Sequence, residues 1–446
     1  MTELVARIAA PPRPGSVAQL ARAGAAGAAL VLVALGLADA IDTTSVSGPL
    51  ALLGGVALVG FLVLTIRHYD TSVAIGLLLM GVVRVEPAPT DICFAVIMCV
   101  AAVTGRFRLS RGPPLLRWLV AVLLIVNLAS ITDVVSISAA VRFLFITVYL
   151  LIFTLWLTQY VDSTKHARLV VVTWLVIGVA SAVLAALALH FPIPGRSFIN
   201  GSVDNGERAS GLFKDPNVFG PFLIPIAVIL LEQHIAPKTP RLLRLRAWST
   251  WLCLLALTLG VLFSYSRAAW ADYAIAIVVM LAASSMRRRG ASRALRALMA
   301  LLLVGGITVV ILSATGSIHF LESRAHAQSY DTHRFAAQTL GWELGWTHPL
   351  GIGPGQFEYH SPVASHSTFV RVFAEQGFLG MVLWVALLLA TLVLALIWAG
   401  AARRRRASSE QSWATLGLAR PNGRDGPPRR RDRTLVQPGR PYARSR

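Results

Sequence analysis

Long apolar segments dominate the chain, and short polar connections separate them. About twelve of these segments approach the ~20 residues that an α-helix needs to cross a bilayer. The predicted spans are 22–40, 47–66, 71–86, 90–105, 116–131, 138–158, 167–190, 218–234, 247–264, 268–285, 296–313 and 369–398. The third, fourth and fifth are short, so we expect their ends to be displaced by several residues. The pattern predicts an all-α polytopic membrane protein.

Basic residues alternate between the two sides of these spans when the N-terminus is placed in the cytoplasm. The connections after even-numbered spans hold most of them: Arg67; Arg106, Arg108, Arg111 and Arg117; Lys165 and Arg168; Lys238, Arg241, Arg244 and Arg246; Arg287, Arg288, Arg289 and Arg293. Cytoplasmic loops carry an excess of Lys and Arg, so both termini are predicted to be cytoplasmic. The two longest loops, 191–217 and 314–368, then lie outside, and the second is expected to carry short surface helices before the last span.

Composition agrees with a multi-pass membrane protein, because 55% of the residues are hydrophobic and 14% are charged. We divide the chain into a cytoplasmic N-terminus (1–21), a membrane domain (22–398) and a disordered, basic cytoplasmic tail (399–446). The net charge of +20 comes from clustered arginines. Such clusters favour membrane lipids as partners, and no basic stretch is interleaved with aromatics as in nucleic-acid-binding domains. The three cysteines lie in apolar segments and suggest neither a disulfide framework nor a metal site.

Few basic residues occur in the predicted outside loops, and two of them suggest a site. Arg267 lies in the short turn FSYSRAAW, where it could bind an anionic substrate or reach lipid phosphates as a snorkelling side chain. Arg334 follows Asp331, which we predict to be the N-cap of a helix. Trp342 and Trp346 lie on one face of that helix and would hold it along the membrane surface. A solvated loop arginine is the alternative for Arg334.

A third cation precedes span eight in the segment GLFKDPNVFGPF. Asp215 followed by Pro216 predicts a helix start with the aspartate as N-cap. The N-terminus of this helix would point outward and favour negative charge. Lys214 adds a cation there, and Asn217 lies in the first turn. Simple capping is the alternative explanation.

His366 is the candidate base, because it precedes the last span on the predicted outer side. A histidine in this setting can be neutral at pH 7 and accept a proton. The other histidines of the loop do not have metal-ligand spacing, so we expect no metal site. Glu375 lies on the far side of a helix from His366, and we expect it to structure the outer helix end. One base with three cations is a coherent set for a diphosphate-linked substrate.

Four motifs resemble the O-antigen ligase and Wzy-type polymerase superfamily of bacterial membrane glycosyltransferases. They are DPNVFG (Asp215 to Gly220), SRAAW (Ser266 to Trp270), R…HPLGIGPGQF (Arg334 to Phe357) and HSTFVRVFAEQGFLG (His366 to Gly380). The resemblance covers roughly residues 200–395 and does not distinguish ligases from polymerases. There are two departures from the pattern. Ser367 and Thr368 stand where an Asn is common, and no large C-terminal outside domain follows, which argues against the protein O-glycosylating branch.

The resemblance implies an inverting, metal-independent transfer of a glycan from a polyprenyl diphosphate carrier to an acceptor sugar hydroxyl, with no cofactor. By this likeness His366 would deprotonate the hydroxyl of a glycan or glycolipid acceptor, and Arg267 and Arg334 would hold the diphosphate. The reaction would take place at the outer face of the cytoplasmic membrane. We place an O-antigen ligase first and keep a polymerase that joins lipid-linked repeat units as the alternative. A 12-span transporter is the alternative from another class, but no clear internal repeat is visible.

Overall fold

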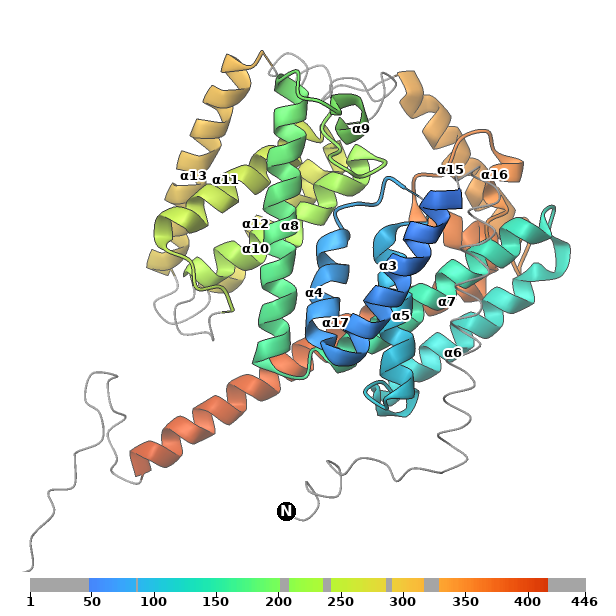
Figure 1. Cartoon of the computed structure of the whole chain (residues 1–446), viewed down its shortest axis with the longest axis horizontal. Helices are drawn as coiled ribbons and strands as arrows, with labels where there is room; N and C mark the ends of the chain where they lie inside the picture. Colours follow the sequence, from blue (N-terminus) through green and yellow to red (C-terminus); the bar gives the residue numbers. More distant parts are fainter. Residues whose placement is uncertain are drawn as a thin grey trace, which may run out of the picture. The chain divides into compact units, whose positions relative to one another are not determined.

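The computed structural model describes residues 48–85, 87–200, 208–235, 242–285, 291–316 and 329–415 (Figure 1). Within these ranges all regular structure is helical and no strand occurs. The predicted all-α class is therefore confirmed for the part of the chain that is described. The N-terminal segment 1–21 and the first predicted span, 22–40, lie outside it.

The helices follow one another with short connections. In chain order they are α3 (Gly48–Arg67), α4 (Tyr69–Leu79), α5 (Pro89–Val103), η1 (Leu109–Arg111), α6 (Pro114–Ala129), η2 (Ser130–Asp133), α7 (Ile137–Tyr160), α8 (Thr164–His190), α9 (Arg196–Asn200), α10 (Pro216–Ile235), α11 (Ala247–Phe263), α12 (Arg267–Ser285), α13 (Ala291–Ala314), α15 (Ser329–Thr347), α16 (Phe357–His360) and α17 (Thr368–Thr415).

Five stretches of helix are long and apolar enough to cross a membrane: Pro114–Thr132, Ile137–Tyr160, Thr164–His190, Pro216–Gln233 and Thr368–Ile397. Shorter apolar helices accompany them, including α4, α5 and α11. The protein is therefore a helical membrane protein, and the number of twelve crossings stays a prediction.

Several helix ends differ from the predicted spans. α4 ends at Leu79 rather than at 86, because the chain then turns away and the Val83 N–H donates to the carbonyl oxygen of Leu212 at 3.1 Å. α17 begins at Thr368 and continues to Thr415, past the predicted end at 398. It is kinked at Gly377, which has a φ of 67°. The chain divides into two compact units between Trp384 and Val385.

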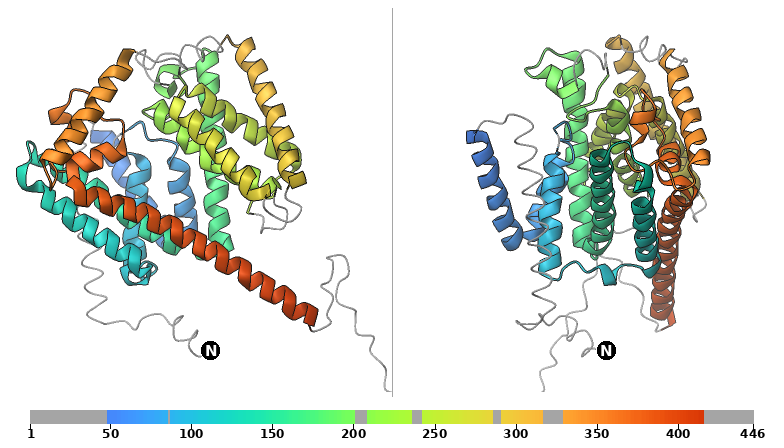
Figure 2. Two further views of the ribbon diagram at one scale, coloured as in Figure 1. Left: turned by 180° about the vertical axis from the view of Figure 1, so that it is seen from behind. Right: turned by 90° about the vertical axis from the view of Figure 1, so that its right-hand side faces the viewer.

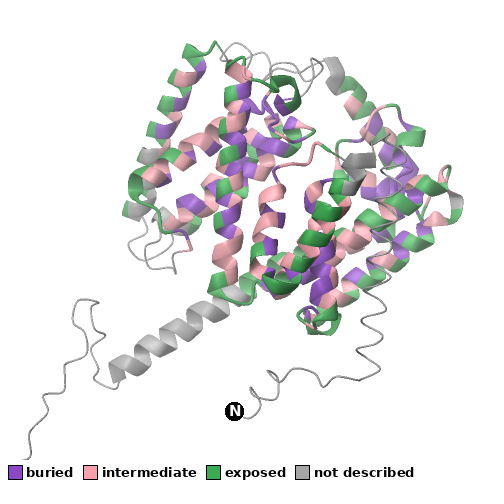
Figure 3. Ribbon diagram, in the orientation of Figure 1, coloured by how far each residue is buried: buried purple, intermediate pink, exposed green. Residues whose placement is uncertain are grey.

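A buried apolar cluster joins α8, α10, α11 and α12, whose inward faces are buried (Figure 3). Leu223 of α10 and Leu257 of α11 are fully buried in it. Small residues let these helices approach closely, as is common in membrane helix pairs. A Cβ atom at Gly260 of α11 would lie 2.6 Å from Leu223 Cδ1 and 2.8 Å from Ala182 Cβ of α8. This close packing holds the start of α10 against the turn between α11 and α12.

α15 packs on the first part of α17, and both are seen from two directions in Figure 2. The contact uses two glycines four residues apart, Gly341 and Gly345. A Cβ atom at Gly345 would overlap the ring of Phe373 in α17. Trp342 and Trp346 flank the same ring, with centroids 5.0 and 5.1 Å away. The glycine face therefore fixes α15 beside the segment that follows His366.

Candidate active site

The N-terminus of α10 is built as the sequence predicts. The Asp215 carboxylate accepts a hydrogen bond from the Asn217 N–H at 2.8 Å, and its carbonyl oxygen accepts from Val218 and Phe219. Pro216 is the first helical residue. Asp215 is therefore the N-cap of α10. The other N–H groups of this first turn give the helix end a partial positive charge.

The α10 start packs directly on the turn between α11 and α12, so that the DPNVFG and SRAAW motifs are in contact. A Cβ atom at Gly220 would lie 2.7 Å from Ser264 Oγ and 2.9 Å from Ala269 Cβ. There is therefore no room for a side chain at this position. Arg208 ties the two motifs together. Its Nε donates to the carbonyl oxygen of Ser264 at 3.0 Å, and its Nη2 donates to Asn217 Oδ1 at 3.0 Å.

Arg267 is the first residue of α12 and is partly exposed. The turn before it has an unusual backbone, because Tyr265 is buried with a φ of 47°, in the left-handed region that side chains other than glycine rarely adopt. Its ring packs edge-on against Trp270, with centroids 6.4 Å apart. Ser266 Oγ accepts from the Ala269 N–H at 3.4 Å and caps α12. The turn thus fixes where α12 begins and where its first residue, Arg267, lies.

The glycine-rich segment HPLGIGPGQF lies along the backbone of α17 just before its kink. Gly351, Gly353 and Gly355 have φ values of 83°, 97° and 71°. The Ile352 N–H donates to Ala374 O at 2.9 Å, and the Gly353 N–H donates to Glu375 O at 3.0 Å. A Cβ atom at Gly351 would overlap the Glu375 carbonyl group. Only glycine combines this backbone conformation with so close an approach.

Gln356 and Glu375 anchor this glycine turn by side-chain hydrogen bonds. Gln356 is fully buried; its Oε1 accepts from the Ser136 N–H and its Nε2 donates to Ser136 O, both at 2.9 Å. Glu375 Oε1 accepts from the Phe357 N–H at 3.4 Å and from Arg371 Nε at 3.0 Å. Glu375 therefore joins the turn to α17.

His366 lies in the loop just before α17; it is exposed over much of its surface but partly buried, and it has a φ of 49°. Its neighbours hold it on both sides. Ser367 Oγ accepts from the Val370 N–H at 3.5 Å, so Ser367 caps α17. The Ser365 carbonyl oxygen accepts from Gln338 Nε2 of α15 at 3.3 Å. Serine thus provides a cap at the position where the superfamily commonly has Asn.

The surroundings of His366 connect it with two of the predicted site residues. Partial burial and the positive charge of Arg334 lower the pKa of His366, and the negative charge of Asp215 raises it in part. A lowered pKa keeps the imidazole neutral at pH 7 and able to accept a proton. Three residues far apart in sequence are therefore electrostatically coupled.

The remaining predicted cations lie just before α10 and at the start of α12. Lys214 is exposed next to Asp215, and Arg267 follows the turn against which α10 packs.

One prediction is wrong: Asp331 is not the N-cap of α15, because Ser329 is already helical. Three contributors were not predicted, Arg208, Gln356 and Arg371. Of these, only Gln356 could have been selected from the sequence, because it directly follows three closely spaced glycines.

Within the described ranges, no three or more His, Cys, Asp or Glu side chains form a group that could hold a metal ion. His319 and His326 lie outside the described residues.

The structure defines a helical membrane protein, and the predicted site residues lie at or near helix ends and in the loop before α17. Residues 252–385 match the family model described as "Wzy_C: O-Antigen ligase". The match confirms the resemblance to the O-antigen ligase and Wzy-type polymerase superfamily. It covers Arg267, Arg334 and His366, and it begins after the DPNVFG motif. A search of curated proteins found no match to the chain, and a search of solved structures found none either.

The family match gives the broad function. The match over residues 252–385 supports a role of the O-antigen ligase or polymerase type in cell-surface polysaccharide biosynthesis. Members of this family are expected to have a glycosyltransferase-like activity on a lipid-linked glycan and a glycan acceptor, which is what the match implies for this chain.

Proposed function

We propose that this protein transfers a glycan from a polyprenyl diphosphate carrier to an acceptor sugar hydroxyl at the outer face of the cytoplasmic membrane. The observation that carries the proposal is the position of His366, whose pKa is lowered by partial burial and by the charge of Arg334, while Asp215 acts in the opposite direction. The enzyme has an inverting, metal-independent mechanism. Both termini lie in the cytoplasm, which follows from the distribution of basic residues.

His366 is the general base of this reaction. Its neutral imidazole takes the proton of the acceptor hydroxyl as the hydroxyl oxygen attacks the anomeric carbon of the donor sugar. The bond from that carbon to the diphosphate oxygen breaks, and its electron pair leaves with the diphosphate. Attack from the face opposite the leaving group inverts the anomeric centre. General-base help of this kind contributes about 10²–10⁴-fold in rate.

The cations stabilise the departing diphosphate. Guanidinium groups donate paired, charge-assisted hydrogen bonds to phosphate oxygens, and this is the role of Arg267 and Arg334. Lys214 and the positive end of α10 add to the same electrostatic environment. Asn217 and Glu375 have supporting roles, since one lies in the first turn of α10 and the other holds the glycine turn.

Asp215 and Arg334 tune the base in opposite directions. Arg334 favours the neutral form of His366, which is needed before proton transfer, and Asp215 favours the protonated form that exists afterwards. When a negatively charged diphosphate binds Arg334, it offsets the charge that lowers the histidine pKa. His366 therefore becomes a stronger base once the donor is bound.

The family description supports a ligase, and a polymerase that joins lipid-linked repeat units is the alternative. Removal of the gene distinguishes them through the polyprenyl-linked glycans that accumulate. Long chains stranded on the carrier identify a ligase, and single repeat units without long chains identify a polymerase. Unchanged lipid-linked glycans would contradict both and would favour a transporter.

A further inference from the structure

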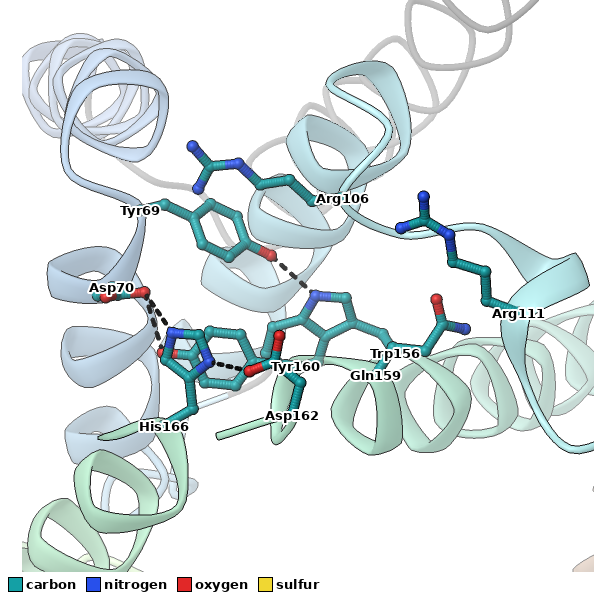
Figure 4. A pocket seen from close by; sticks show the side chains of 9 residues that line it. All are labelled: Tyr69, Asp70, Arg106, Arg111, Trp156, Gln159, Tyr160, Asp162 and His166. Carbon is teal, nitrogen blue, oxygen red and sulfur yellow. Dashed lines mark hydrogen bonds and ion pairs between the residues drawn. The ribbon is translucent and has the colours of Figure 1, made fainter. Parts of the chain in front are cut away.

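A cavity of about 320 Å³ lies at the end of α8 opposite the candidate active site (Figure 4). α8 has 27 residues and is thus about 40 Å long. His166 in its first turn lines the cavity, whereas Ala185 near its other end accepts a hydrogen bond from Asn200, which also holds the segment leading to α10. The cavity is therefore separate from the glycan-transfer site. It lies on the predicted cytoplasmic side.

The wall of the cavity is aromatic and fixed in place. Trp156 and Tyr160 are stacked, with ring centroids 5.3 Å apart and an interplanar angle of 15°. Trp156 Nε1 donates a hydrogen bond to the Tyr69 hydroxyl at 2.8 Å. All three side chains are buried. The cavity therefore has a preformed shape.

The carboxylates on one side of the cavity are already partnered. Asp70 Oδ2 accepts from Lys165 Nζ at 2.5 Å, and Asp70 Oδ1 accepts from the Tyr160 hydroxyl at 3.4 Å. Asp162 Oδ1 lies 2.8 Å from His166 Nδ1. Lys165 offsets the charge of Asp70, and His166 lies against both carboxylates, so these carboxylates already have partners within the protein.

The other side of the cavity offers hydrogen-bond donors. The Arg106 guanidinium lies 4.5 Å from the centre of the Tyr69 ring, and Arg111 also lines the cavity. Gln159 Oε1 accepts from the Arg108 N–H at 3.2 Å, which fixes the amide. Gln159 Nε2 is buried, and no acceptor for it exists among the described residues. A buried donor without an acceptor is costly, so this side favours an acceptor-rich, negatively charged group.

We propose that this cavity binds the phosphate group of a phosphate ester. Phosphate oxygens accept hydrogen bonds, and arginine binds them with paired donors. The volume is at the lower end of the range for small-molecule sites. The ester comes from one of two sources, a phospholipid headgroup or a soluble phosphorylated compound. Headgroup binding is typical of basic pockets between membrane helices on the cytoplasmic side. This binding is independent of glycan transfer.

The test is thermal unfolding of the full-length protein in detergent, because a ligand that binds the folded state raises the midpoint. Phosphatidylglycerol is titrated into the micelles in one series, and inorganic phosphate is titrated against chloride at equal ionic strength in another. The test variant carries Arg106→Gln and Arg111→Gln. The matched control carries Arg244→Gln and Arg246→Gln, which removes the same charge from exposed positions on the same predicted side.

We expect the wild type and the control to respond to one probe, and the test variant to bind it at least about tenfold more weakly, since each charged hydrogen bond contributes roughly that factor. A response to phosphatidylglycerol alone identifies a headgroup, and a response to inorganic phosphate identifies a soluble ester. If the test variant does not fold, Arg111→Gln alone replaces it. No shift with either probe, or equal weakening in the test variant and the control, would overturn the proposal.

Discussion

His366 has a pKa that partial burial lowers and that the positive charge of Arg334 lowers further, although the two residues come from different elements, the loop before α17 and α15. Asp215 at the start of α10 acts on the same histidine with the opposite sign. The imidazole of His366 is therefore influenced by two opposite charges. In the proposed mechanism the Arg334 cation binds the donor diphosphate, and the Asp215 anion stabilises the protonated histidine. This relationship is the centre of the proposed mechanism.

The pH dependence of activity should follow from these two signs. A lowered histidine pKa places the acidic limb of kcat/KM below the usual value of about 6.5. Arg334→Gln removes the cation that lowers the pKa, so the limb should move to higher pH. Asp215→Asn keeps an N-cap residue but removes the anion, so the limb should move to lower pH. Shifts of both variants in the same direction would contradict the assignment of His366 as the titrating base.

Arg267→Lys should impair transfer, because a lysine keeps the charge but loses the paired donors of the guanidinium. A loss of about tenfold or more in kcat/KM is expected if one charge-assisted hydrogen bond is lost. Arg196→Lys is the control, since Arg196 is exposed in α9 on the same predicted side. Full activity of Arg267→Lys would instead support a side chain that only reaches lipid phosphates.

Gly220→Ala tests the contact between α10 and the α11–α12 turn. The added Cβ would lie 2.7 Å from Ser264 Oγ, so the helix must shift or the turn must deform. Overpacking of this kind costs about 1–3 kcal/mol, and we expect a lower midpoint of thermal unfolding together with lower activity. Gly305→Ala in α13 is the matched control, because nothing lies within 4 Å of its Cβ position. Equal behaviour of the two variants would contradict the close packing.

Gln356→Leu tests the anchor of the glycine turn. It removes both hydrogen bonds to Ser136, at a cost of about 1–3 kcal/mol for each polar group left without a partner in a buried setting. We expect reduced stability and a reduced kcat, measured by thermal unfolding and by transfer assays. A variant with wild-type values in both would show that the turn holds its position without this anchor.

The sequence was informative where local chemistry decides the structure. The cap at Asp215 follows from residue types at fixed offsets, and the helical class follows from apolar periodicity. It was misleading at Asp331, because a capping residue also occurs inside helices and the true start lies upstream.

Other features were not accessible from sequence because they depend on long-range packing. The two hydrogen bonds between Gln356 and Ser136 join residues 220 positions apart. The left-handed backbone of Tyr265 is imposed by its buried setting and contradicts the preference of the residue. Arg208 was not selected as a site residue, since its role depends on the approach of α10 to the turn before α12.

The most direct test of the account is transfer activity of the His366→Gln variant. Membranes of a strain without the gene supply the accumulated lipid-linked glycan and the acceptor, and purified protein is added to them. His333→Gln is the matched control, since His333 is an exposed histidine in α15 on the same predicted side. The account predicts that His366→Gln folds and inserts but transfers about 10²–10⁴-fold more slowly than the control. Transfer by His366→Gln at the wild-type rate would contradict the role of His366 as the base.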